Sequence, residues 1–215
     1  MLFELLNNPT LPKIIEFLLF IVGLIIAITV HEASHAALSW HLGDPTAKLQ
    51  GRLTLNPLAH LDPLGTLMIL IVRFGWGKPV PFDPFNLKNP RRDGAIISMA
   101  GPVANFITAV LFTIPLWAGF LIHNSQLSFF GELLVPIVFL NLALGIFNLI
   151  PVHPLDGFKV LGGFLPKNWY EDFQQMERYG ILILIFLLIP FAGVSIIATI
   201  LGPVLNSILS LILPG

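Results

Sequence analysis

Four long apolar stretches constrain the fold of this chain more than any other feature. They cover residues 14–42, 95–122, 132–150 and 181–213. A helix needs about 20 apolar residues to cross the hydrocarbon core of a bilayer, and each stretch approaches or exceeds that length. Hydrophobic residues make up 55% of the chain and charged residues only 11%, whereas about 25% of the residues in soluble domains are charged. The sequence therefore predicts an integral membrane protein.

The expected fold class is an all-α polytopic membrane protein, built as a single intramembrane domain over residues 1–215. We expect about five to six transmembrane or re-entrant helices with short membrane-associated β-strands. Pro190 and Pro203 interrupt the last stretch, which predicts one kinked helix or two short ones. The segments GRLTLN (51–56) and GKPVPF (77–82) are candidates for the strands. The start of the chain has no basic region before its apolar residues and does not read as a signal peptide.

The distribution of basic residues predicts the orientation in the membrane. Lysines and arginines flank the apolar stretches, but residues 123–131 contain none. The positive-inside rule therefore puts this link outside, with 95–122 running outward and 132–150 returning. The short apolar run 64–76 has basic loops on both sides, so we expect it to be re-entrant or shallow. The first helix then ends on the cytoplasmic side near residue 42, in a multi-pass protein of the cell membrane.

Charge and cysteine content exclude several classes of function. The net charge of −1 leaves no basic surface to neutralise phosphates, so nucleic acid is not an expected partner. The chain has no cysteine, so any metal site must use histidine and carboxylate ligands.

The motif HEASH, residues 31–35, lies in the second half of the first apolar stretch. His31 is eleven positions before residue 42, roughly 16 Å from that helix end, and thus inside the membrane, nearer the cytoplasmic side. His31 and His35 share one helix face, where two imidazoles can bind one zinc ion. Glu32 is offset by one residue and could accept a proton from a water at the ion. Ionisable residues inside a bilayer are costly and usually functional, which favours a metal site.

Zinc needs a third protein ligand, and the residues alone leave several candidates. Asp156 follows the cytoplasmic end of the stretch 132–150, although Asp-Gly is also a common turn pair. His60 and Asp62 lie in a polar loop, where such residues more often cap turns. His153 is close to Asp156 but precedes a proline.

The order of these motifs resembles the site-2 protease family of intramembrane zinc metalloproteases. The family pattern is HEASH in a membrane helix, followed by FNLIPVHPLDG near the end of a later one. The stretches GRLTLNPLAHLDPLGT, FGWGKPVPFDP, NPRRDGA and MAGPVANF are similar to the short prokaryotic branch of the family. Together these stretches cover residues 29–157 in the family's order. Residues 75–94 are too few for the PDZ domain of many relatives, so the resemblance is to the form without one.

The resemblance implies one zinc ion per chain, held by His31, His35 and Asp156, with Glu32 as general base. It implies a substrate-positioning or oxyanion role for Asn148, for which an interhelical hydrogen bond remains an equal alternative. It also implies hydrolysis of peptide bonds in transmembrane protein substrates within the lipid bilayer. Gly101 and Asn105 match another family stretch, but we favour a close helix crossing there.

Two further expectations concern substrate binding and rival functions. One of the two predicted strands could pair with an unwound substrate segment. The rivals are a catalytically silent membrane protein of the same fold that binds substrates and a metal-binding transporter. A transporter would place ionisable residues along several helices, and the stretches 95–122 and 181–213 have no acidic residue. A di-iron membrane oxygenase would need more histidines than the six present.

Overall fold

The structure, a computed structural model, describes residues 7, 9–72, 75–122, 131, 133–191 and 194–214. It is mostly helical, as the sequence predicts. The longer helices are α2 (Leu11–His41), α5 (Pro90–Ile122), α7 (Val135–Asn148), α10 (Glu177–Leu188) and α11 (Ile196–Ile212). The shorter elements are α3 (Thr46–Leu49), η1 (Pro57–Ala59), α4 (Pro63–Val72), η2 (Pro84–Asn86), α8 (Asp156–Phe164), α9 (Lys167–Gln175), β1 (Pro190–Phe191) and β2 (Val194–Ser195).

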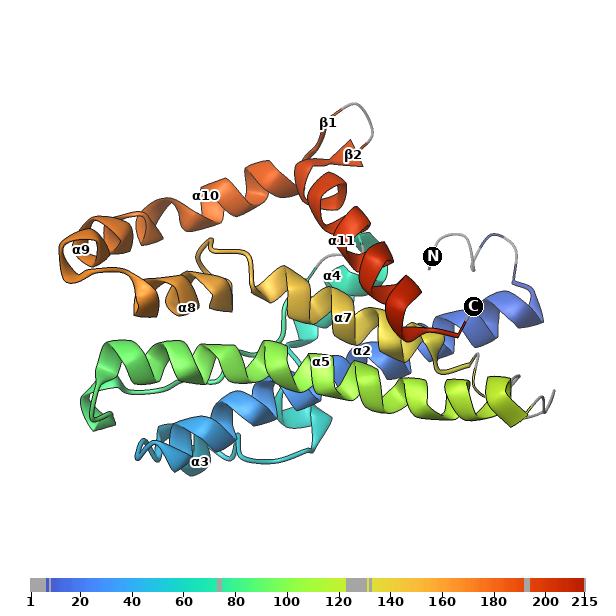
Figure 1. Cartoon of the computed structure of the whole chain (residues 1–215), viewed down its shortest axis with the longest axis horizontal. Helices are drawn as coiled ribbons and strands as arrows, with labels where there is room; N and C mark the ends of the chain where they lie inside the picture. Colours follow the sequence, from blue (N-terminus) through green and yellow to red (C-terminus); the bar gives the residue numbers. More distant parts are fainter. Residues whose placement is uncertain are drawn as a thin grey trace.

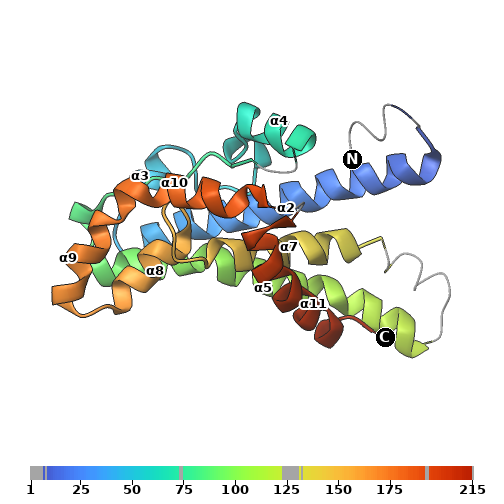
Figure 2. The same ribbon diagram turned by 90° about the horizontal axis from the view of Figure 1, so that it is seen from above.

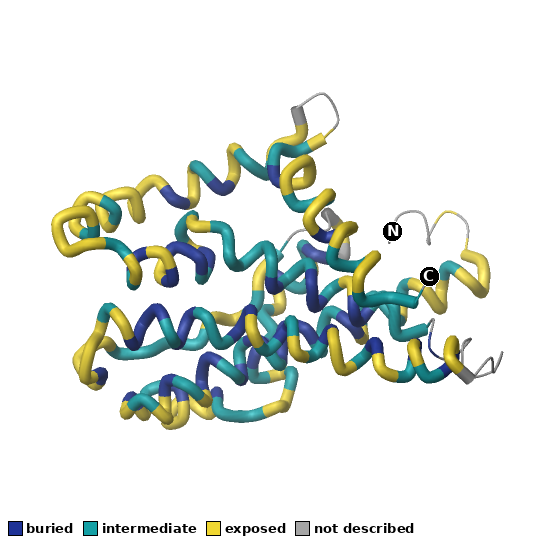
Figure 3. The backbone as a smooth tube through the Cα atoms, in the orientation of Figure 1, coloured by how far each residue is buried: buried dark blue, intermediate teal, exposed yellow. Residues whose placement is uncertain are grey.

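Three helices form the centre of the molecule. Figures 1 and 2 show α2, α5 and α7 running side by side, and each of them contacts the other two. Helix α8 returns along the first half of α5, and α9 and α10 extend from it as an arm. The buried residues gather where α2, α5 and α7 meet, whereas the arm is mostly exposed (Figure 3). This packing fixes the relative positions of side chains that are far apart in the sequence.

Local signals explain where the central helices begin and end. Pro12 lies in the first turn of α2, where a missing backbone N–H costs no hydrogen bond. Gly43 follows the end of α2 at a φ of 107°, a conformation that favours glycine. At the start of α5 the Asp93 carboxylate accepts a hydrogen bond from the Asn89 backbone N–H at 2.8 Å, which caps the helix.

Two of the described helices are long and apolar enough to cross a membrane. They are Leu11–His41 and Pro90–Leu121, and only 28% and 39% of their most apolar windows are buried. Their outer faces expose large apolar side chains, such as Leu18 on α2 and Ile107 and Leu111 on α5. A helix that is apolar on its outer face is typical of a lipid environment. Together with their length, this composition suggests a membrane protein.

The predicted helices are confirmed to within a few residues, and the last stretch forms two helices, α10 and α11, rather than one. The predicted number of membrane-spanning segments, the single domain and the orientation stay predictions. Residues 73–74 of the 64–76 run and residues 123–130 of the predicted outer link lie outside the described residues.

The prediction of a strand at GRLTLN is wrong. The Arg52 guanidinium donates to the Ala59 carbonyl, and the His60 ring bonds to the Thr54 carbonyl at 2.9 Å. Asn56 accepts from the Leu58 N–H and so starts a 3₁₀ turn. These side chain–backbone bonds curl the segment into a loop, because they compete with strand pairing. GKPVPF contributes only one bridge, between Leu61 and Gly77, and the described hairpin, β1 with β2, lies between α10 and α11.

Candidate metal centre

The structure brings His31, His35 and Asp156 together. The Asp156 Oδ2 atom lies 2.9 Å from His31 Nε2 and 3.2 Å from His35 Nε2. One ligand atom from each residue lies within 4.8 Å of the other two, and in the described ranges this is the one group of three such residues that could hold a metal ion. Two imidazole nitrogens and a carboxylate oxygen are a donor set that suits zinc. The three residues therefore fit the ion that the sequence predicts.

Asp156 reaches the histidines because the chain turns sharply after α7. Residues 149–155 lead from the end of α7 into α8, of which Asp156 is the first residue. A Cβ atom at Gly157 would overlap the Leu149 carbonyl, so the turn needs a glycine at this position. The Asp-Gly pair itself begins α8 and does not form the turn, which lies just before it at residues 153–154 and brings the carboxylate to the histidines.

Helix α5 holds the Nδ1 atom of each candidate ligand histidine. His31 Nδ1 lies 2.6 Å from Asn105 Oδ1, and His35 Nδ1 lies 2.7 Å from the Ile97 carbonyl. Both partners are acceptors, so each Nδ1 donates, which leaves Nε2 of the neutral imidazole as the atom that could bind a metal ion. Such contacts behind a metal site fix the tautomer and the orientation of the ligands.

Asn105 thus does more than the packing role that we favour from the sequence. Its Nδ2 donates to the Ala27 carbonyl and to Asn141 Oδ1, both at 2.9 Å. Asn105 and Asn141 are fully buried, and Asn141 in turn donates to the Ile137 carbonyl at 2.9 Å. This chain of amides joins α2, α5 and α7 behind His31. Sequence reasoning missed Asn141, although an asparagine within an apolar stretch is itself a signal of a buried polar contact.

Gly101 permits the close approach of α5 to the two histidines. A Cβ atom on Gly101 would lie 2.5 Å from His35 Nε2 and 2.6 Å from His31 Nε2. These separations are far below van der Waals contact, so no side chain fits at this position. The close helix crossing expected at Gly101 is therefore present, and it occurs at the candidate metal centre itself.

Glu32 lies beside the two histidines at a cavity of about 150 Å³. Its Oε2 accepts a hydrogen bond from the Val80 N–H at 3.1 Å. All three candidate metal ligands, Glu32 and Asn148 line this cavity, together with Val80. The cavity thus presents a metal site, a carboxylate and an amide to one small space.

Asn148 lines the cavity, and its hydrogen bond among the described residues is within α7, not between helices. Its Nδ2 donates to the Leu144 carbonyl of the same helix at 3.0 Å. Its role stays a prediction.

The remaining ligand candidates from the sequence lie outside the described metal group. His60, Asp62 and His153 each have another partner. His60 is fully buried and bonds to the Thr54 carbonyl. The Asp62 carboxylate caps α4 by accepting from the Gly65 N–H at 2.7 Å. His153 lies 3.6 Å from the Glu177 carboxylate. The loop-capping interpretation of Asp62 agrees with this arrangement.

Comparison with known proteins identifies the family of this chain. The sequence model described as peptidase family M50 matches residues 120–191, a range that contains Asn148 and Asp156 and follows the HEASH motif. The chain is 37% identical to "Putative zinc metalloprotease YwhC" of Bacillus subtilis over 198 residues, which are 87% of this chain and 85% of the relative. It is 32% identical to Rip2 of Mycolicibacterium smegmatis, which bears the same description, over 80% of this chain and 67% of that protein.

Rip2 of Mycobacterium tuberculosis strain H37Rv is 29% identical over 81% of this chain and 67% of its own length. No solved structure matches the chain. The match to YwhC covers most of both proteins, and the buried donor set of two imidazoles and a carboxylate suits the metal in the relatives' description. The chain therefore belongs to peptidase family M50, the site-2 protease family of zinc metalloproteases.

Proposed function

We propose that this protein is an intramembrane endopeptidase that hydrolyses peptide bonds within or near the transmembrane segments of other membrane proteins. One observation carries the proposal: two of the three candidate metal ligands, His31 and His35, lie in the second half of α2, a helix long and apolar enough to span a bilayer. Ionisable residues on a membrane-spanning helix cost free energy in lipid and are usually functional. Their presence on α2 therefore favours chemistry that takes place within the membrane.

The proposed roles follow from the geometry around the small cavity. His31, His35 and Asp156 would hold the zinc ion, which when bound supplies a Lewis acid that acidifies water and polarises a peptide carbonyl. Glu32 would accept the proton of the attacking water, because its carboxylate lines the same cavity as the ligands. The Val80 N–H holds Oε2 at 3.1 Å and so limits the positions that the carboxylate can take.

Asn148 is the proposed contact for the substrate. It lines the cavity from the last turn of α7, and an amide N–H at this place could stabilise negative charge on the substrate carbonyl oxygen. The hydrogen bond to the Leu144 carbonyl uses only one of the two hydrogens on Nδ2. The second hydrogen remains for a substrate.

The segment 77–82 is the proposed guide for the substrate backbone. A peptide bond in a helix is hydrogen-bonded and shielded, so the substrate must be extended before water can attack it. Pro79, Val80 and Phe82 line the cavity, whereas no residue of 51–56 does so. The segment 77–82 is non-helical and already forms one antiparallel bridge through Gly77. We therefore assign substrate pairing to this segment and not to the other sequence candidate.

Localisation and partners follow from the same proposal. The protein would be a multi-pass protein of a prokaryotic cell membrane, with its active site nearer the cytoplasmic side. The support is the position of the basic residues, which flank the helix ends near α3, α5 and α8. Its partners would be transmembrane protein substrates in the bilayer.

Cleavage of a single-span substrate in lipid vesicles tests the proposal. The wild-type protein should cut the substrate within or beside its apolar segment, at a site mapped by mass spectrometry. Glu32→Gln should lower the rate at least a hundredfold, since general-base catalysis contributes about that much. Cuts only in soluble regions, or full activity of Glu32→Gln, would contradict the proposal; binding of substrate without any cut would favour the catalytically silent alternative.

A further inference from the structure

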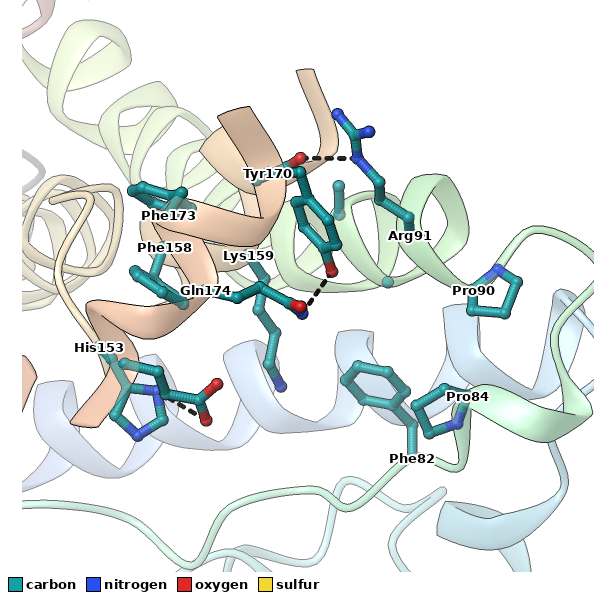
Figure 4. Close-up of a pocket in the computed structure, with 14 residues that line it drawn as sticks. Phe82, Pro84, Pro90, Arg91, His153, Phe158, Lys159, Tyr170, Phe173 and Gln174 are labelled. Carbon is teal, nitrogen blue, oxygen red and sulfur yellow. Dashed lines mark hydrogen bonds and ion pairs between the residues drawn. The ribbon is translucent and has the colours of Figure 1, made fainter. Parts of the chain in front are cut away.

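A second cavity of about 390 Å³ lies next to the metal centre (Figure 4). It is enclosed by α8, α9, the first turns of α5 and the loop around Phe82. Phe82 and Lys159 line this cavity and also the small cavity at the metal ligands. The two cavities therefore share part of their wall, and the larger one lies beside the space in which the scissile bond would lie.

Contacts among its own residues build the wall of the larger cavity. The rings of Phe158 and Phe173 stack with centroids 4.4 Å apart. The Arg91 guanidinium lies over the Tyr170 ring at 4.5 Å, and its Nε donates to the Gly162 carbonyl at 2.9 Å. The arginine is thus occupied in holding α5 to α8 and α9. The space is largely preformed, with an aromatic lining.

Lys159 differs from the other charged residues of this wall. Its ammonium lies 4.4 Å from the centroid of the Phe82 ring, and Figure 4 shows it reaching into the space between Phe82 and His153. In the part of the chain that the structure describes, no carboxylate lies within ion-pair distance of it. The nearby acids have other partners, since Asp156 faces the two metal-centre histidines and Glu177 pairs with His153.

We propose that the larger cavity takes the part of the substrate that continues past the scissile bond, and that Lys159 pairs there with an acidic side chain of the substrate. This inference rests on the proposed function. An extended chain advances about 3.3 Å per residue, so a residue only a few positions from the scissile bond would reach Lys159. An unpaired cation beside aromatic rings is a site that favours a carboxylate over its neutral isostere.

A scan with acidic and neutral substrates tests the pairing. A single-span peptide that the wild-type protein cuts is prepared with Glu, Gln or Lys at each position near the cut, in vesicles of phosphatidylcholine. We expect kcat/KM for Glu over Gln to rise about five- to tenfold at one or two adjacent positions, as for a partly desolvated ion pair. Lys159→Met should abolish this ratio, Lys159→Arg should keep it, and Lys159→Glu should instead favour Lys at the same position.

Lys167→Met is the matched control, because Lys167 is an exposed lysine at the same end of the molecule that lines neither cavity. It should leave the Glu-to-Gln ratio of the wild type unchanged. A Glu-to-Gln ratio of kcat/KM near one at every position in the wild type would overturn the inference, and so would a raised ratio that persists in Lys159→Met. Either result would leave the proposed protease function intact. No cleavage of any peptide by the wild type would instead count against the proposed function.

The phosphate of an anionic lipid is the other anion that could reach Lys159. The scan is therefore repeated with phosphatidylglycerol in the vesicles. We expect this lipid to change the rates of wild type and Lys159→Met equally. A lipid effect that disappears in Lys159→Met would assign the cation to a headgroup and overturn the pairing with substrate.

Discussion

For single residues, the contacts behind the candidate metal ligands are as informative as the candidate ligands themselves. Asn105 accepts from His31 Nδ1 and is held in place by Asn141 and the Ala27 carbonyl. Because an amide can rotate to present either its oxygen or its nitrogen, these two further bonds select the oxygen for the histidine. The orientation of His31 therefore depends on residues from two other helices.

Replacement of Asn105 should weaken zinc binding. Asn105→Leu removes the acceptor for His31 Nδ1, so we expect the zinc affinity to fall about ten- to a hundredfold, as for other contacts of this kind. Competition with a chromophoric chelator measures the affinity, on protein that retains the wild-type helix content. Asn206→Leu is the control, because Asn206 occupies the same place in GPVLN of α11 but is exposed. An unchanged affinity in Asn105→Leu would contradict this role.

Some residues of this site can be predicted from the sequence, and others cannot. His31, Glu32 and His35 follow from helical spacing alone, because the period of a helix puts positions four apart on one face. Asp156 needs the family resemblance, since only tertiary packing decides whether an Asp-Gly turn faces the histidines. Asn141 carries no motif, and its contact with Asn105 depends on a helix crossing that no local pattern specifies.

At the scale of helices and loops, the chain contains a natural comparison for the crossing of α2 and α5. The sequence Gly-Pro-Val occurs at Gly101 in α5 and at Gly202 in α11. A Cβ atom at Gly101 would collide with both His31 and His35, whereas a Cβ atom at Gly202 would meet nothing within 4 Å. The same local sequence thus lies at a close contact in one helix and in open space in the other.

Alanine at these two glycines should have opposite effects. Gly101→Ala forces the histidines or α5 to shift, which we expect to cost about 1–3 kcal/mol of stability and to remove most of the bound zinc. Gly202→Ala should be neutral or stabilising by up to about 1 kcal/mol, because alanine favours the helix. Thermal unfolding in detergent and zinc analysis measure both effects. Equal behaviour of the two variants would argue against the crossing.

Asp44 connects the end of α2 to the loop that leads away from segment 77–82. Its carboxylate accepts from the Ser39 hydroxyl at 3.0 Å, the Asp83 N–H at 2.8 Å and the Asn86 amide at 2.9 Å, and also from Thr46. Burial of the carboxyl opposes ionisation, but these hydrogen bonds outweigh it and lower the pKa of Asp44 to about 2. The charged form is therefore the one that the fold stabilises.

The stability that Asp44 contributes should depend on pH in a defined direction. A pKa that is lower in the folded than in the unfolded state stabilises the fold above about pH 4. This contribution is lost as the pH falls from 4 through the folded-state pKa. We expect Asp44→Asn to have a lower Tm than the wild type at pH 7, with the difference shrinking as the pH falls below 4. A difference that is independent of pH would contradict this explanation.

The sequence predicts the conformation of the loops less well than that of the helices, for a physical reason. The strand expected at 51–56 rests on alternation, but Arg52, Asn56 and His60 bond to backbone groups of the same loop. Such bonds compete with strand pairing and depend on the three-dimensional path of the chain. The apolar helices are predicted well because their length and composition are local properties.

At the scale of the whole molecule, a polar site sits within an apolar exterior. The outer faces of α2 and α5 expose leucine and isoleucine side chains, while the buried polar residues His31, Asn105 and Asn141 meet where α2, α5 and α7 pack together. The buried amides of Asn105 and Asn141 bond to each other and to backbone carbonyls, as a lipid environment requires. Composition alone predicts the exterior, but only the packing of the three helices shows that the polar groups form one site.

The central claim is that three residues, from α2 and α8, hold one zinc ion within this bundle. Zinc content per chain, measured on the purified wild type, Asp156→Ala and Glu32→Gln after dialysis against a weak chelator, tests it most directly. We predict about one zinc in the wild type and in Glu32→Gln, and little in Asp156→Ala, since a three-ligand protein site loses most of its affinity with one ligand removed. Full zinc in Asp156→Ala, or none in the wild type, would contradict the claim.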